Sequence, residues 1–138
     1  MFDANYKKDK LEIEHQFPQI YLADKKFHFD ASGNMLKHIL NRKELNPLDE
    51  KYLEHGKLKK FNQKEFGDNA GLSEFGYVFY PNACLKKDCS LHVSLHGWSG
   101  GAVDWPENGS NIIHYAASND LVVLYPFAEK CWYTDQNE

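Results

Sequence analysis

The stretch LHVSLHGWSGG, residues 91–101, carries most of the information about the fold of this sequence. Its first five residues form a β-prone run, and a turn rich in glycine follows them. In open α/β sheets, ligands gather at the carboxyl ends of the strands. The turn that begins with His96 and Gly97 is therefore the first place to look for a functional site.

Two interpretations of this turn are open. Glycines let backbone N–H groups point towards a ligand, and His-Gly after a strand is how many esterases build an oxyanion hole. On this interpretation His96 marks the oxyanion site, and Gly97 and Trp98 form its loop. The alternative is a strand-to-helix turn with no catalytic role.

The same turn matches the pattern G-x-S-x-G, which would make Ser99 a candidate nucleophile. A nucleophile elbow needs a helix directly after the turn, but Pro106 and Gly109 fall where that helix should run. The only later histidine, His114, lies on a segment with a helical apolar stripe, where a packed or solvated ring is expected. Ser99 is therefore the weaker hypothesis.

The rest of the chain predicts an α/β fold in which the second half has the order strand, strand, helix, strand. The expected elements are a capped helix over 35–40, one further turn over 48–53, strands over 77–80, 91–95 and 121–125, and a helix over 112–117. Residues 57–72 are expected to be a polar connection anchored by Phe61 and Phe66. We expect one domain over 1–138, with a helical and loop segment over 1–70 and a strand-rich segment over 71–138.

Composition excludes several classes of protein. Hydrophobic residues make up 42% of the chain and aromatic residues 14%, which is too much for a disordered tail. A formal net charge of −4 argues against a nucleic-acid partner. No apolar run reaches the roughly 18 residues of a membrane span, and the first ten residues are too polar for a signal peptide.

The cysteines and histidines predict a disulfide and no metal site. Cys84 and Cys89 are close enough in sequence to form a clip in an oxidising compartment, which leaves Cys131 over. The seven histidines are scattered and no C-x-x-C pair accompanies them, so we expect neither a metal nor another cofactor.

A series of short segments runs in a fixed order through most of the chain, from His15 to Trp132. The segments are His15–Pro18, Phe29–Gly33, Leu45–Pro47, Gly56–Leu58, Phe61–Gln63, Glu65–Phe66, Gly76–Pro81, Cys84 with Cys89, Leu91–Gly97, Asn119–Pro126 and Cys131–Trp132. Their order and spacing resemble the polyhydroxybutyrate depolymerase family of esterases, in the arrangement whose oxyanion-hole histidine follows the catalytic triad in sequence. The resemblance implies an incomplete α/β-hydrolase-type sheet of about three strands with flanking helices.

The resemblance also implies roles for residues. His15 corresponds to the general base of the triad, and His96 with the backbone after it corresponds to the oxyanion site. The family's serine nucleophile and aspartate would precede His15. The sequence departs from the family at three positions: Gln19 stands for a threonine, and His28 and Trp98 each stand for a cysteine.

The resulting hypothesis is a part of a serine ester hydrolase that acts on a polyester or small ester, is extracellular like the family, and is inactive alone. One alternative is a non-catalytic module that binds a polyester or carbohydrate surface through Trp98, Trp105 and Trp132. The other is a minimal esterase that uses Ser99. The sequence indicates no oligomeric state.

Overall fold

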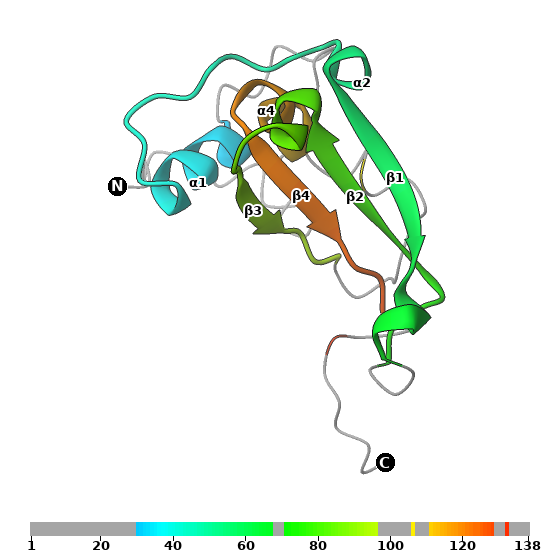
Figure 1. The fold of residues 1–138 in the computed structure, drawn as a ribbon. Helices are drawn as coiled ribbons and strands as arrows, with labels where there is room; N and C mark the ends of the chain where they lie inside the picture. Colours follow the sequence, from blue (N-terminus) through cyan, green and yellow to red (C-terminus); the bar gives the residue numbers. More distant parts are fainter. Residues whose placement is uncertain (1–29, 68–70, 97–105, 107–110, 129–131, 133–138) are drawn as a thin grey trace, which may run out of the picture.

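The computed structural model describes residues 30–67, 71–96, 106, 111–128 and 132. These residues form a four-stranded sheet in the order β1-β2-β4-β3 (Figure 1). The strands are β1 (Gly56–Asn62), β2 (Phe75–Pro81), β3 (Ser90–Val93) and β4 (Leu121–Tyr125). The helices are α1 (Ala31–Ile39), α2 (Tyr52–His55) and α4 (Ile112–Ser118), with short 3-10 turns η2 (Gln63–Phe66) and η3 (Asn82–Leu85).

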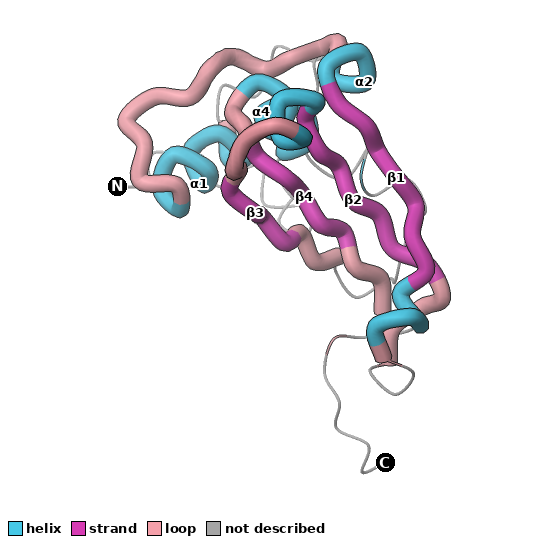
Figure 2. The backbone as a smooth tube through the Cα atoms, in the orientation of Figure 1, coloured by secondary structure: helices cyan, strands magenta, loops and turns pink. Residues whose placement is uncertain are grey.

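The sheet is mixed. The strands β1 and β2 form an antiparallel pair, and β2 pairs with β4 in the same antiparallel sense. Only β3 and β4 are parallel, and the chain between them contains α4, as a parallel pair requires a long crossover (Figure 2). The α/β class is confirmed. The parallel neighbours of a doubly wound sheet occur only at this one pair within the described residues.

Strand β1 was not expected. Its residues 57–62 lie in the segment assigned to a polar connection, and three of them are lysines, Lys57, Lys59 and Lys60. An edge strand tolerates such a sequence because lysines protect an open edge from pairing with another chain. Phe66 is not an anchor, since 78% of it is exposed, while Phe61 is partly buried.

Helix α1 was expected over 35–40 behind a run of capping residues, and it begins earlier, at Ala31, directly after the capping residue Asp30. The Asp30 carboxylate accepts a hydrogen bond from the Gly33 N–H at 2.7 Å, which satisfies one of the free N–H groups of the first turn. The same carboxylate accepts a hydrogen bond from the Tyr115 hydroxyl. The cap therefore joins α1 to α4.

The core lies between the sheet and the helices. Helix α4 packs on β2 and β4 and also contacts α1 and α2 (Figure 1). The fully buried core side chains include Leu36, Phe79, Ile113, Leu121, Val123 and Tyr125. Alternate residues of β4 are buried, so one face of that strand supplies the core.

Candidate functional site

His96 lies just past the carboxyl end of β3. The Ser94 N–H donates to the Leu124 carbonyl at 2.8 Å, so the chain stays paired with β4 as it approaches the turn. His96 itself is 5% exposed. The sequence thus placed this residue correctly at the end of a strand of an α/β sheet.

The His96 ring is held by the backbone that follows β4. The Ala128 N–H donates to His96 Nε2 at 3.0 Å, and the ring stacks on Phe127 with centroids 5.6 Å apart. Because Nε2 accepts this hydrogen bond, the neutral ring carries its hydrogen on Nδ1. The ring therefore joins the ends of two parallel strands.

The backbone of His96 is also fixed. The Trp132 indole N–H donates to the His96 carbonyl at 2.9 Å, and the two rings lie 4.9 Å apart. This contact and the bond from Ala128 hold both the main chain and the side chain of His96. The arrangement orients the chain at the point where the glycine-rich turn begins.

Gln63 is a residue of this region to which the sequence assigned no role, although Phe61–Gln63 is one of the segments of the family resemblance. It is the first residue of η2 and is 2% exposed. Its Nε2 donates to the Ser73 carbonyl at 2.8 Å and to the Phe127 carbonyl at 3.0 Å. Its Oε1 accepts from the Phe127 N–H at 3.0 Å. The residue lies in a lysine-rich segment without a burial period, so no sequence signal marked it as buried.

Several expected site residues lie outside the described residues. They are His15, Gly97, Trp98 and Ser99, together with Trp105 and Cys131. Of the three tryptophans of the binding hypothesis, Trp132 alone is described. It is half-buried against His96.

Two further histidines, His114 and His92, are at least partly buried by neighbouring residues. His114 Nδ1 lies 3.0 Å from the Asp49 carbonyl, and its ring meets Tyr52 edge-on at 4.5 Å. His114 is thus packed, which is one of the two environments, packed or solvated, expected for it. His92 lies on β3, where burial lowers its pKa below the usual 6.5.

No group of three His, Cys, Asp or Glu side chains that could hold a metal occurs in the described part of the chain. His92 and His96 are four residues apart, a spacing that brings two ligands together on a helix. Here His92 lies on β3 and His96 lies past the carboxyl end of that strand, so the two residues do not share a helix face. Within the same residues, no helix is long and apolar enough to cross a membrane.

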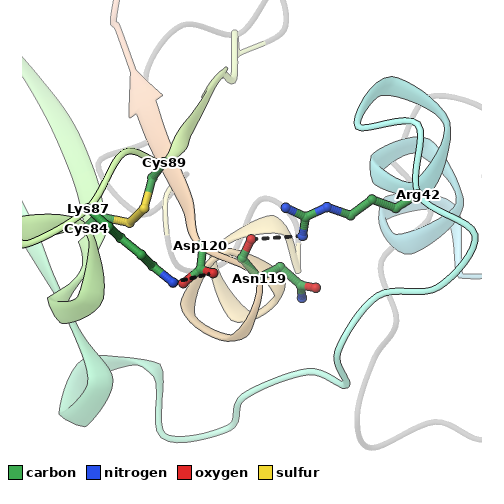
Figure 3. Close-up of a disulfide and its surroundings, with 6 residues drawn as sticks. All are labelled: Arg42, Cys84, Lys87, Cys89, Asn119 and Asp120. Carbon is green, nitrogen blue, oxygen red and sulfur yellow. Dashed lines mark hydrogen bonds and ion pairs between the residues drawn. A yellow bond between two sulfur atoms is a disulfide. The ribbon is translucent and has the colours of Figure 1, made fainter.

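The disulfide between Cys84 and Cys89 is present, as predicted from their spacing. It links η3 to the residue before β3 (Figure 3). His96 follows the other end of that strand. Beside the disulfide, Lys87 Nζ lies 2.7 Å from Asp120 Oδ2, directly before β4. The clip and the ion pair together fix how β3 starts next to β4.

Known proteins that are similar to this chain include polyhydroxybutyrate depolymerases. No protein-family model matches the chain. A poly(3-hydroxybutyrate) depolymerase from Delftia acidovorans is 32% identical over 123 residues, which cover 81% of this chain and 24% of that protein. A polyhydroxybutyrate depolymerase from Talaromyces funiculosus is 31% identical over 113 residues, which cover 73% of this chain and 30% of that protein.

Two solved structures share the fold. One is a PHB depolymerase variant complexed with an R3HB trimer, and the other is the PHB depolymerase from Penicillium funiculosum. Each has a TM-score of 0.61 and 30% identity and covers 72% of this chain and 32% of that chain. The chain thus spans about a quarter to a third of the length of these relatives. In sequence and in fold, this chain is similar to one part of the polyhydroxybutyrate depolymerases, and its mixed sheet with flanking helices matches part of their α/β-hydrolase-type fold.

Proposed function

We propose that this chain forms part of a serine ester hydrolase that cleaves a hydroxyalkanoate polyester or a related small ester. In this proposal, His15 is the general base, and backbone N–H groups of Gly97 and Trp98 form the oxyanion site that His96 positions. One observation carries the proposal. The ring and the backbone of His96 are both fixed at the end of β3, within a fold shared with polyhydroxybutyrate depolymerases.

The proposed chemistry is acyl transfer to a serine. The serine oxygen attacks the ester carbonyl while the histidine takes the hydroxyl proton, and a tetrahedral oxyanion forms. N–H donors in the loop stabilise that oxyanion, and the histidine then gives its proton to the departing alcohol. Water releases the acid in a second round of the same steps. No metal or other cofactor is needed for this sequence of steps.

The 138 residues alone are proposed to be inactive. They span about a quarter to a third of the relatives' length, and His15 supplies a base only where a serine and an aspartate accompany it. Loss of one oxyanion donor slows such enzymes by about 10²- to 10³-fold, but loss of the nucleophile removes the covalent route itself.

The test is hydrolysis of a short-chain acyl ester by the purified chain, followed for an initial burst and for turnover. We expect neither, and the Ser99→Ala variant should behave like the unaltered chain. Hydrolysis that disappears in Ser99→Ala but persists in the exposed-surface control His38→Ala would reject the proposal and favour the elbow at Ser99. Retention of the chain on polyester granules without hydrolysis would instead favour a binding module.

The disulfide supports an extracellular location for the protein. Such bonds form and persist in oxidising compartments and are rare in the cytosol. An extracellular protein should yield Cys84 and Cys89 blocked to a thiol-alkylating reagent when it is isolated from its source without reductant. Complete alkylation of both residues would contradict this location.

A further inference from the structure

Gln63 pairs with Phe127 as a neighbouring strand would. Its side-chain oxygen accepts from the Phe127 N–H and its side-chain nitrogen donates to the Phe127 carbonyl, each at 3.0 Å. The same nitrogen also donates to the Ser73 carbonyl at 2.8 Å. A buried amide is costly unless it is hydrogen-bonded, and this one uses both ends on the backbone.

The hydrogen bonds between Gln63 and Phe127 act on His96 through the rigid peptide that joins Phe127 to Ala128. The Phe127 carbonyl and the Ala128 N–H belong to the same planar, trans peptide unit, so they point in opposite directions. The carbonyl is held by Gln63 Nε2 and by the Ser73 N–H at 2.8 Å. Holding the Phe127 carbonyl therefore sets the direction of the Ala128 N–H, which donates to His96 Nε2.

The space for the Gln63 amide is provided by a glycine on β2. A Cβ atom at Gly76 would lie 2.6 Å from Gln63 Oε1 and 3.0 Å from its Cδ. Any side chain at position 76 would therefore force the amide to move. The position offers a second way to disturb Gln63 without changing its chemistry.

We propose that Gln63 is a positioning residue that fixes the tautomer and orientation of His96 by orienting the Phe127–Ala128 peptide. The functional meaning of this control rests on the proposed function, because His96 positions the oxyanion loop. The tautomer is a property of the chain itself and can be measured without any ester hydrolysis.

The experiment is long-range ¹H–¹⁵N NMR of the histidine rings in the full chain, under conditions in which the rings are neutral. The His96 signals are assigned by their loss in His96→Gln. In the unaltered chain, His96 should be in the Nδ1–H form. The isosteric Gln63→Met variant should give a mixture of both tautomers, and Ala128 amide exchange should accelerate by about tenfold. Gly76→Ala, which displaces the amide, should change both readouts in the same direction.

Two matched controls separate positioning from general loss of stability. Asn119→Leu removes another buried amide, 3% exposed, which bonds to Asn46, Tyr115 and Ser118 near the amino end of β4. Gly56→Ala introduces a clash with Phe79 at the far end of the β1–β2 pair. Both should leave the His96 signals unchanged.

The proposal is wrong if Gln63→Met and Gly76→Ala keep the single Nδ1–H form, or if Asn119→Leu disturbs it equally. Should Gln63→Met fail to fold, Gly76→Ala against Gly56→Ala decides the question. An unchanged tautomer would overturn this inference and leave the ester hydrolase proposal intact. A missing hydrolytic activity would not affect it.

Discussion

Removing the disulfide should destabilise the chain by a calculable amount. In the double variant Cys84→Ser/Cys89→Ser, the unfolded chain regains the freedom that the cross-link removes. The two cysteines are five positions apart, and loop closure over so short a segment corresponds to about 2 kcal/mol. The bond holds the start of an edge strand whose residues are mostly exposed, so little apolar burial in β3 can offset the loss.

The assay is urea unfolding of both proteins, followed by tyrosine and tryptophan fluorescence. With a slope of about 1–3 kcal/mol per molar urea for a small protein, the midpoint should fall by about 1 M. Reductant should lower the urea midpoint of the unaltered chain to that of the double variant. It should leave the midpoint of the double variant unchanged, because that variant keeps Cys131 but has no disulfide to reduce. Equal midpoints for the two proteins without reductant would refute the reasoning that the clip constrains the unfolded chain.

Two further predictions concern titratable groups that are wholly or partly buried. Burial raises the pKa of Tyr125. Its hydroxyl has no hydrogen-bond partner among the described residues, and burying such a group costs free energy. Removing that hydroxyl in Tyr125→Phe should therefore raise the free energy of unfolding by up to about 1 kcal/mol. As a comparison, Tyr115→Phe removes a hydroxyl that donates to Asp30 and should lower the free energy of unfolding. A loss of stability in Tyr125→Phe would contradict the first prediction, because it would reveal a hydrogen-bond partner for the Tyr125 hydroxyl. Burial lowers the pKa of His92 below 6.5, so the unfolded state binds more protons, and stability should fall as the pH drops below about 6.5. Urea midpoints between about pH 7.5 and pH 5 should fall less in His92→Gln than in the exposed-site control His38→Gln, and equal falls would show that His92 does not contribute.

Local signals in the sequence located most of the elements. The apolar residues at 35–40 behind Asp30 predicted α1, and the continuous apolar run at 121–125 predicted β4. Each signal depends on residues close together in the chain, through capping, helical period or strand propensity. The sheet order could not be obtained in this way, because the pairing of β2 with β4 joins residues far apart in sequence.

The missed features are polar residues whose role is decided by tertiary structure. The lysines of β1 resemble a solvated connection, yet they suit an edge strand that needs little burial. Gln63 is buried because Ser73 and Phe127 come together around it, which no local pattern indicates. The position of His96 at a strand end was predictable, whereas its bond to Ala128 depends on a segment thirty-two positions later.

The proposed role in catalysis is best tested in a complete enzyme. The segment of the Talaromyces funiculosus depolymerase that is similar to this chain, 30% of that protein, is replaced by residues 15–132 of this chain, so that the chimera carries both His15 and Ser99. The measurement is the rate at which this chimera hydrolyses poly(3-hydroxybutyrate), with His15→Ala and Ser99→Ala compared in the same background. The account predicts measurable hydrolysis that Ser99→Ala retains and His15→Ala abolishes. A folded chimera without activity, or activity that survives His15→Ala, would contradict it.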